Sequence, residues 1–354
     1  MAEQIIESDV LVIGGGLAGC WAAMRARARG LRVVLADKAV LGYSGCTSMG
    51  GNFQLSPMPE EELDSWRREL VETGEFINDQ AWVESLLREQ GERFQELVSW
   101  GVPFERDEKG QILRRKGRGH KTTFMSYCDS QGLMKVLRGK VLESGTRLVE
   151  RVMIVELLTA DGRHPTQSPV VGAVGFHTRT GEFLVFRAKA TVMTAGPMFG
   201  MKLPGYVAAN CTGDAPMMAY RAGVELTGME FCINGHPAFY DGRYLYGALD
   251  NLVQAAGAIL VNSQGERFME RYDPVLMERA KWQVTCRAIA KENLEGRGPV
   301  YVDMTKFSQG DRQLLTKFRL NPPDRSYRET GFDPSRDKAP CIARMRVASS
   351  CGEG

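Results

Sequence analysis

The sequence predicts an α/β protein that begins with a strand–helix–strand unit of a parallel sheet. Residues 9–13 form a short apolar run that ends in three glycines, which is typical of a buried parallel strand. A segment rich in small residues follows and ends at Gly30, where a helix C-cap is expected. Residues 31–36 form a second apolar run, with Asp37 at its end. Together these features predict a βαβ unit at the start of the fold.

The loop between the first strand and the helix carries the pattern Gly14-x-Gly16-x-x-Gly19. Gly14 permits a tight turn, Gly16 allows backbone amides to approach a pyrophosphate, and Gly19 allows the helix to pack closely on the strand. The N-terminus of the helix adds partial positive charge for the phosphates. Asp37 is placed to accept hydrogen bonds from ribose hydroxyls, and an acidic residue there disfavours a 2′-phosphate. The unit predicts a dinucleotide site, for which FAD and NAD are both candidates.

The rest of the chain alternates helical and strand-like patterns. Residues 59–101 have apolar positions near helical spacing, and residues 132–142 predict a further helix. The segment 152–195 is β-rich, and residues 300–302 predict one more strand. We place a change of domain near Glu230, where a mixed segment begins.

Composition and charge argue against several classes of protein. Apolar residues make up 43% and charged residues 25% of the chain, which is typical of a globular protein. A formal net charge of +2 gives no reason to expect a nucleic acid or an anionic membrane as a partner. No apolar stretch reaches the roughly 18 residues that a membrane span needs. The N-terminus has no signal-peptide pattern, so we expect no membrane span and no leader.

The eight cysteines are scattered along the chain, and no two of them form a C-x-x-C pair. This spacing argues against a disulfide framework, a structural zinc site and an iron–sulfur cluster held by this chain alone. We therefore expect no metal site and a reducing compartment, the cytoplasm.

A basic cluster stands out in the middle of the chain. Its members are Arg114, Arg115, Lys116, Arg118, His120 and Lys121. Charge runs of this kind are usually solvated loop faces. The alternative is a site for an anionic partner or substrate.

Several segments, in their order along the chain, resemble the flavin-site segments of one flavoprotein family. They are residues 44–51 (Ser-Gly-Cys-Thr-Ser-Met-Gly-Gly), 188–196, 212–214 with 219–223, 229–237 and 262–269. The ordered set resembles the flavoprotein subunits of fumarate reductase and succinate dehydrogenase and their relative aspartate oxidase. The resemblance extends from Asp9 to about Pro340.

The resemblance implies a Rossmann-like FAD-binding domain with an inserted α+β capping (lid) domain. The expected boundaries are residues 1–229 for the first part of the FAD-binding domain and 230–345 for the capping domain. The family then returns to complete the flavin domain and adds a helical domain, and we expect both parts to be absent from this chain.

The resemblance also implies which residues hold the FAD. The segment from Gly14 to Asp37 would hold the pyrophosphate and the adenosine ribose, and residues 152–154 would face the adenine. Residues 44–51 would run beneath the isoalloxazine. Asp214 matches the family's flavin-contacting aspartate, although its position after a glycine also suits a turn cap. The residues expected to bind the cofactor are Gly14, Gly15, Gly16, Leu17, Ala18, Gly19, Asp37, Lys38, Ser44, Gly45, Cys46, Thr47, Gly50, Gly51, Met153, Thr194, Ala195, Gly196 and Asp214.

The chain lacks the early histidine of the respiratory members of the family. Those members join the flavin covalently to a histidine near the segment that begins at Ser44. No histidine lies between Met1 and Gly119 in this chain, so we expect the FAD to be noncovalent. We interpret Cys46 as a small buried cysteine and not as a substitute attachment site.

The catalytic residues are assigned by resemblance alone. His236 matches the family histidine that hydrogen-bonds a substrate carboxylate. Where the family has two functional arginines, hand alignment gives Gln254, which has no charge, and Trp282, which does not exchange protons. A small shift of the alignment brings Arg279 into the proton-relay position. The catalytic candidates are therefore His236, Arg279 and Arg287.

The missing C-terminal part predicts a partner. An incomplete parallel sheet exposes an apolar edge and face, which normally require cover. The expected partner is a polypeptide that carries iron–sulfur clusters or completes the flavin site, or a second copy of this chain. Through such a partner the protein would also reach a membrane surface, and its small-molecule partner would be a carboxylate substrate.

Three functions remain open from the sequence. The first is an FAD-dependent oxidoreductase that moves a hydride between flavin N5 and a substrate bond beside a carboxylate. The second is an FAD-binding or electron-transfer subunit without its own substrate chemistry, completed by a partner chain, which suits Gln254 and Trp282. The third is an enzyme similar to aspartate oxidase that passes electrons to oxygen or fumarate.

Overall fold

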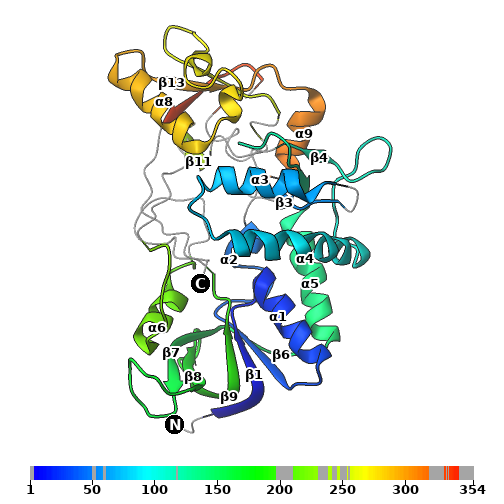
Figure 1. Cartoon of the computed structure of the whole chain (residues 1–354), viewed down its shortest axis with the longest axis vertical. Helices are drawn as coiled ribbons and strands as arrows, with labels where there is room; N and C mark the ends of the chain where they lie inside the picture. Colours follow the sequence, from blue (N-terminus) through cyan, green and yellow to red (C-terminus); the bar gives the residue numbers. More distant parts are fainter. Residues whose placement is uncertain are drawn as a thin grey trace. The chain divides into compact units, whose positions relative to one another are not determined.

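The computed structural model describes residues 4–49, 53–58, 61–116, 119–196, 210–229, 238–240, 245–247, 253, 256–318, 331, 333 and 335–342. These residues divide into two compact units (Figure 1). The first unit draws on residues 1–50 and 130–233, and the second on residues 51–129 and 234–347. Strands and helices alternate along the chain, which confirms the predicted α/β class. None of the described helices is long and apolar enough to cross a membrane.

The first unit is built on a six-stranded sheet with the strand order β6-β2-β1-β9-β8-β7. The bounds are β1 Gln4–Ile13, β2 Val33–Asp37, β6 Arg147–Glu150, β7 Val152–Thr159, β8 Val170–His177 and β9 Phe183–Met193. β6, β2, β1 and β9 pair in parallel, whereas β9, β8 and β7 pair antiparallel. The predicted βαβ unit therefore forms the centre of this sheet.

Strand β1 begins five residues earlier than the apolar run that predicted it. Residues 4–8 continue the strand because they pair with residues 184–188 of β9. From residue 5 their burial alternates, with Ile6 and Ser8 buried and Ile5 and Glu7 exposed. A half-buried strand end of this kind has a period-two pattern, which differs from the continuous apolar run of a buried parallel strand.

Four helices accompany this sheet: α1 Leu17–Ala28, α2 Gly45–Met49, α5 Ser130–Glu143 and α6 Asp214–Ala222. α5, predicted at residues 132–142, buries Leu133, Leu137 and Val141 on one face at helical spacing. α1 and α2 both pack against α5, and α6 packs against β7. α1 also packs against β1, β2 and β9, so it is the helix that joins this group to the parallel strands.

The second unit contains two smaller sheets. The first has the order β3-β5-β4, with β3 Phe53–Leu55, β4 Arg114–Arg115 and β5 Met125–Tyr127. The second has the order β11-β10-β14-β13-β12, with β10 Ala238–Tyr240, β11 Leu245–Gly247, β12 Ile259–Val261, β13 Val300–Asp303 and β14 Ala339–Ile342. β13 confirms the strand predicted at residues 300–302.

The helices of the second unit include two that replace the single predicted helical stretch of residues 59–101. They are α3 Leu63–Thr73 and α4 Gln80–Ser99, and the Asp79 side chain caps α4 by accepting hydrogen bonds from the amides of Ala81 and Trp82. Other helical elements described in this unit are η1 Phe268–Arg271, η2 Met277–Arg279, α8 Trp282–Leu294 and α9 Gln309–Phe318.

The core of the second unit explains why residues 51–129 belong to it. Tyr127, from β5, is fully buried in the same cluster as Leu260, Phe268, Ile289 and Val302. The expected domain scheme placed residues 51–129 with residues 1–50, because it put the change of domain near Glu230. The compact units therefore have different boundaries from the expected domains. The functional assignment of those domains stays a prediction.

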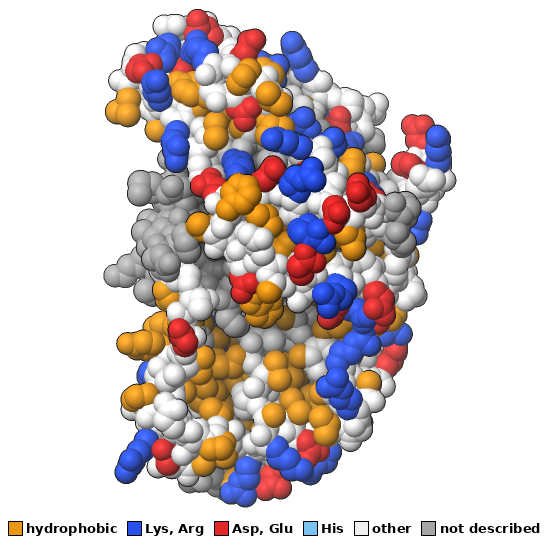
Figure 2. All heavy atoms as spheres, viewed as in Figure 1, with side chains coloured by type: hydrophobic (Ala, Val, Ile, Leu, Met, Phe, Trp, Pro, Cys, Tyr) orange, Lys and Arg blue, Asp and Glu red, His pale blue; other side chains and the backbone are white. Residues whose placement is uncertain are grey.

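The basic cluster is largely paired within the second unit. Arg114 Nη1 lies 2.8 Å from Glu61 Oε1, and Arg115 Nη1 lies 2.7 Å from Asp311 Oδ1. His120 Nδ1 lies 3.0 Å from Glu69 Oε1. Arg118 lies outside the described residues. Positive and negative side chains are also mixed over the face drawn in Figure 2, so these contacts favour a structural role for the cluster over an anion site.

A second ion network lies around the fully buried carboxylate of Glu292 in α8. Arg297 donates to both of its oxygens, from Nε at 2.7 Å and from Nη2 at 2.9 Å. Arg271 Nη2 and the Tyr272 hydroxyl donate at 2.9 and 2.8 Å, and Asn262 Nδ2 donates at 3.1 Å. The hydrogen bonds from Arg297, against the opposing effect of burial, hold the pKa of Glu292 well below its ordinary value.

We predict that Glu292→Gln destabilises the chain by about 2 to 3 kcal/mol at neutral pH, because charged donors lose a buried acceptor. Urea unfolding followed by circular dichroism measures this loss. Glu295→Gln is the matched control, since Glu295 also contacts Arg297 but is 41% exposed. We expect that variant to lose less than about 1 kcal/mol.

The difference in unfolding free energy between the native chain and Glu292→Gln depends on pH in a defined way. Because the folded-state pKa is lowered, the contribution of Glu292 is fully present above the ordinary carboxyl pKa of 4.5. It is lost as the pH falls from there toward the folded-state pKa. The difference in unfolding free energy between the native chain and Glu292→Gln should therefore shrink on acidification. A difference that stays constant would show that the charge of Glu292 does not stabilise the fold.

Candidate cofactor site

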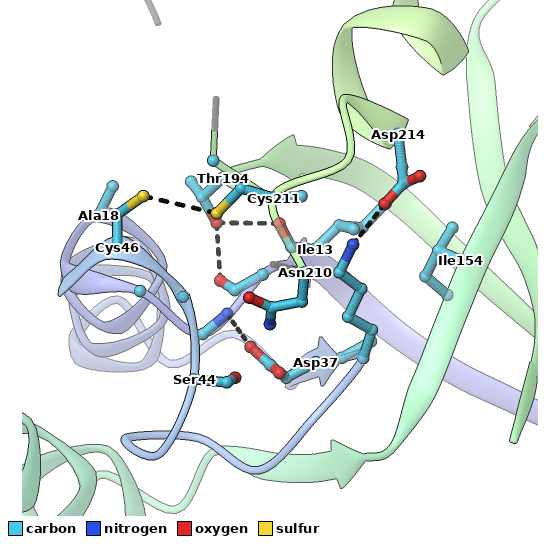
Figure 3. Close-up of a pocket in the computed structure, with 18 of the residues that line it drawn as sticks. Ile13, Ala18, Asp37, Ser44, Cys46, Ile154, Thr194, Asn210, Cys211 and Asp214 are labelled. Atoms are coloured by element: carbon cyan, nitrogen blue, oxygen red, sulfur yellow. Dashed lines mark hydrogen bonds and ion pairs between the residues drawn. The ribbon is translucent and has the colours of Figure 1, made fainter. Parts of the chain in front are cut away.

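A cavity of about 310 Å³ opens in the first unit where β1, β2 and β9 end and α1 begins (Figure 3). Most of the residues predicted to bind the cofactor line this one cavity. They are Gly14, Gly15, Gly16, Leu17, Ala18, Asp37, Lys38, Ser44, Gly45, Cys46, Thr47, Met153, Thr194, Ala195, Gly196 and Asp214. Residues from six segments of the chain thus meet beside the carboxyl ends of the parallel strands, where ligands bind in open α/β sheets.

The glycine loop has the geometry that its spacing predicts. Gly14 has φ +104°, and a Cβ there would lie 2.5 Å from the carbonyl oxygen of Thr194. Gly19 does not line the cavity; a Cβ at Gly19 would lie only 1.9 Å from the Gly14 oxygen. Gly14 and Gly19 therefore serve the close packing of helix on strand. At Gly16 the nearest atom to a Cβ is Thr47 Oγ1 at 3.4 Å, so a Cβ fits there only in direct contact with Thr47.

The N-terminus of α1 points its positive end at the cavity. Its N-cap is Gly16, which has no capping side chain, and the first turn contains no acidic residue. The amide of Leu17 donates to Thr47 Oγ1 at 3.2 Å, which fixes the neighbouring wall. Helix amides and dipole together suit a phosphate group.

Asp37 lies at the end of β2, beside the glycine loop. Its Oδ2 accepts a hydrogen bond from the Gly15 amide at 2.7 Å, and its Oδ1 accepts from the Ala39 amide at 2.7 Å. These bonds fix the carboxylate in the cavity wall. A carboxylate oxygen has two lone pairs, so each can accept a further bond from a ribose hydroxyl.

Two further contacts close the walls of the cavity. Lys38 Nζ donates to Asp214 Oδ2 at 2.6 Å and to Thr212 Oγ1 at 2.8 Å, which ties the end of β2 to the start of α6. The Thr194 hydroxyl lies 2.8 Å from the Gly14 carbonyl and 3.0 Å from that of Ile13, and it ties β9 to β1. Asp214 is thus held by a cation at the cavity rim.

Sequence reasoning missed several lining residues, of which Asn210 and Cys211 are polar or reactive. Cys211 Sγ lies 3.4 Å from Cys46 Sγ. A hydrogen bond from Cys46 lowers the pKa of the Cys211 thiol to about 7, against the opposing effect of burial and with help from the charge of Lys38. The one indication in the sequence that Cys211 belongs to the site is that it directly precedes the segment 212–214, which resembles a flavin-site segment.

Some predicted residues lie elsewhere. Gly50, Gly51, His236 and Gln254 lie outside the described residues. Arg279 is the last residue of η2, where its carbonyl accepts from the Gly119 amide at 2.7 Å. Arg287 is exposed on α8, which begins at Trp282. Arg279 and Arg287 belong to the second unit, and their catalytic roles stay predictions. Among the described residues, no three His, Cys, Asp or Glu side chains group as a metal site.

Comparisons with known proteins identify the family of this chain. The family model of the FAD binding domain matches residues 9–341. One of the subunits of the fumarate reductase (CoM/CoB) of Methanothermobacter marburgensis is 34% identical over 323 residues, covering 86% of this chain and 57% of that protein. The succinate dehydrogenase flavoprotein subunit of Rickettsia bellii is 30% identical over 305 residues, covering 82% and 49%. The chain spans about half the length of the curated relatives it matches.

Solved structures share the fold. The FrdA chain of an E. coli quinol fumarate reductase variant matches with a TM-score of 0.81 at 22% identity, over 96% of this chain and 60% of that chain. The Mycobacterium smegmatis Sdh1 complex in the apo form matches with a TM-score of 0.72 at 25% identity, over 96% and 58%. These likenesses confirm the predicted Rossmann-like fold class. The chain belongs to the FAD-binding domain family, in the group of the fumarate reductase and succinate dehydrogenase flavoproteins.

Proposed function

We propose that this chain is the flavin-binding part of an FAD-dependent oxidoreductase that acts on a carboxylate-bearing substrate. The observation that carries the proposal is the cavity at the start of α1, which combines a glycine loop, an uncapped helix N-terminus and an acidic residue at the end of β2. This combination fits the pyrophosphate and the ribose of FAD.

The residues of the cavity have distinct proposed roles. Backbone amides of residues 14–18 bind the pyrophosphate, Asp37 binds the adenosine ribose, and Met153 faces the adenine. Residues 44–47 and 194–196 line the path of the remaining flavin. The bound flavin would supply a hydride donor or acceptor at N5. The Thr194 hydroxyl holds the end of β9 to the end of β1 in this wall of the cavity.

The substrate side of the proposal rests on the family resemblance. His236 anchors a substrate carboxylate, and Arg279 or Arg287 supplies the cationic or proton-relay function. Residues 230–345 act as a capping domain that excludes water. The relatives named fumarate reductase and succinate dehydrogenase support a dicarboxylate as the substrate class.

A second candidate is an FAD-binding or electron-transfer subunit completed by a partner. Gln254 and Trp282 favour it, and the relatives are themselves named as subunits. Among the described residues, β8 pairs with β9 only as far as Arg187, and Val192 beyond it is 36% exposed. An unpaired strand edge with apolar exposure suits a covering chain. Iron–sulfur partners, and a cytoplasmic location or one peripheral to a membrane, stay predictions.

We predict that Gly16→Val lowers FAD affinity about 100-fold while leaving the chain folded. The valine side chain lies beside Thr47 Oγ1 at the helix N-terminus and displaces phosphate from one or two charged hydrogen bonds. Fluorescence titration with FAD measures affinity, and circular dichroism measures folding. Gly19→Val is the matched contrast, because its side chain meets the Gly14 carbonyl and should destabilise the unit itself. Unchanged affinity in a folded Gly16→Val variant would exclude the phosphate role.

We predict that the FAD is bound without a covalent bond. The chain lacks a histidine before His120, which removes the family's attachment residue. Acid precipitation of the FAD-loaded protein should leave the yellow colour in the supernatant. Colour that stays with the pellet, on a peptide identified by mass spectrometry, would show that another residue attaches the flavin.

We predict that the FAD-loaded chain alone reduces fumarate poorly. Gln254 and Trp282 replace a carboxylate-binding and a proton-relaying arginine, and loss of a general acid typically costs about 100- to 10,000-fold in rate. Turnover with reduced viologen as the electron donor measures this. Residual turnover should fall further in His236→Ala and Arg279→Ala, but not in Lys291→Ala, whose side chain is 60% exposed on α8. Fast turnover that neither variant affects would remove both residues from the proposal.

A further inference from the structure

Two cysteines distant in the sequence meet in the wall of the cofactor cavity. Cys46 lies in α2 and Cys211 lies just before α6, and their sulfur atoms are 3.4 Å apart. Figure 3 shows the two side chains pointing toward one another from different segments of the wall. Both residues line the cavity.

The distance is short for two thiols that are not bonded. A disulfide has an S–S length of about 2.05 Å, so bond formation requires the sulfurs to approach by roughly 1.4 Å. Gly45, immediately before Cys46, has φ +81°, and an added Cβ would meet no atom within 4 Å. The start of α2 therefore has free space around it for a small shift.

The surroundings of the pair favour thiol chemistry. Cys46 is half-buried and Cys211 is 5% exposed, so a small disulfide reaches Cys46 first. Lys38, held beside Cys211 by Asp214, stabilises negative charge on sulfur. Cys20 and Cys128 differ, because burial raises the pKa of each thiol to about 12.

We propose that Cys46 and Cys211 form a redox-active pair that interconverts between two thiols and a disulfide in the wall of the cofactor cavity. The oxidant is a small disulfide of the glutathione class. The Cys46 thiol loses its proton to solvent and attacks the small disulfide, which releases one small thiolate and leaves a mixed disulfide on Cys46. The Cys211 thiolate then attacks Cys46 Sγ and releases the second small thiolate. The two protein sulfurs together lose two electrons, and one small disulfide gains them and becomes two thiols.

The pair links the redox state of the thiol pool to the flavin cavity. The disulfide joins the segment after β2 to the segment before α6, and the Lys38–Asp214 ion pair already bridges the same two regions. Because the proposal concerns only this chain's sulfurs, it does not depend on the identity of the substrate.

Oxidised glutathione added to the full chain tests the proposal, followed by blocking of thiols, trypsin digestion and mass spectrometry. Cleavage after lysine and arginine places Cys46 in residues 39–67 and Cys211 in residues 203–221, and neither peptide contains another cysteine. We expect these two peptides to become disulfide-linked, and dithiothreitol to separate them. Cys211→Ser should retain glutathione on Cys46, because the resolving thiolate is absent. Cys20→Ser, a buried cysteine near the same loop, should still form the link.

Three results would overturn the proposal. The first is a folded native chain, checked by circular dichroism, in which both cysteines stay reduced at all glutathione ratios. The second is glutathione that persists on Cys46 of the native chain without conversion to the linked peptides. The third is linkage of either cysteine to a different partner. All three are read in the native chain, so they do not depend on whether the serine variants fold.

Discussion

The close approach of α1 to the ends of β1 and β9 is the constraint on which the cofactor cavity depends. A side chain at Gly14 or Gly19 would collide with backbone atoms, and the Thr194 hydroxyl bridges the remaining gap to the carbonyls of Ile13 and Gly14. This packing fixes the direction of the helix axis relative to the sheet. The uncapped amides of the first turn are aimed at the cavity only because the helix is held at this distance.

Local signals in the sequence predicted much of this arrangement. The glycine pattern, the small residues of α1 and Asp37 lie within one βαβ unit, so their spacing alone determines how they meet. Residues 4–8 of β1 were missed because a half-buried strand end carries a weaker pattern than a buried one. Asn210 and Cys211 were missed because they reach the cavity through tertiary packing, which no local period records.

Local patterns in the sequence also do not predict how the chain divides into units. Residues 51–129 contain good helices, but helical periodicity does not say which core a helix joins. The buried Tyr127 and the pairing of β5 with β3 and β4 place the segment with the second unit. The basic residues of this segment illustrate the point at the level of side chains, because Arg115 finds its partner Asp311 far along the sequence. A charge run therefore indicates its environment only after the fold is known.

The order of strands in the first unit has a consequence for how the chain folds. Gln4 of β1 pairs with Leu184 of β9, and Asp37 of β2 pairs with Glu150 of β6. The central sheet thus depends on contacts between residues far apart in the sequence. Residues 51–129 lie between the paired strands in the sequence but belong to the second unit. Such non-local pairing folds slowly, although the entropic cost of closing a long loop grows only with the logarithm of its length. During synthesis, β1 and β2 remain without their outer neighbours until β6 and β9 emerge from the ribosome.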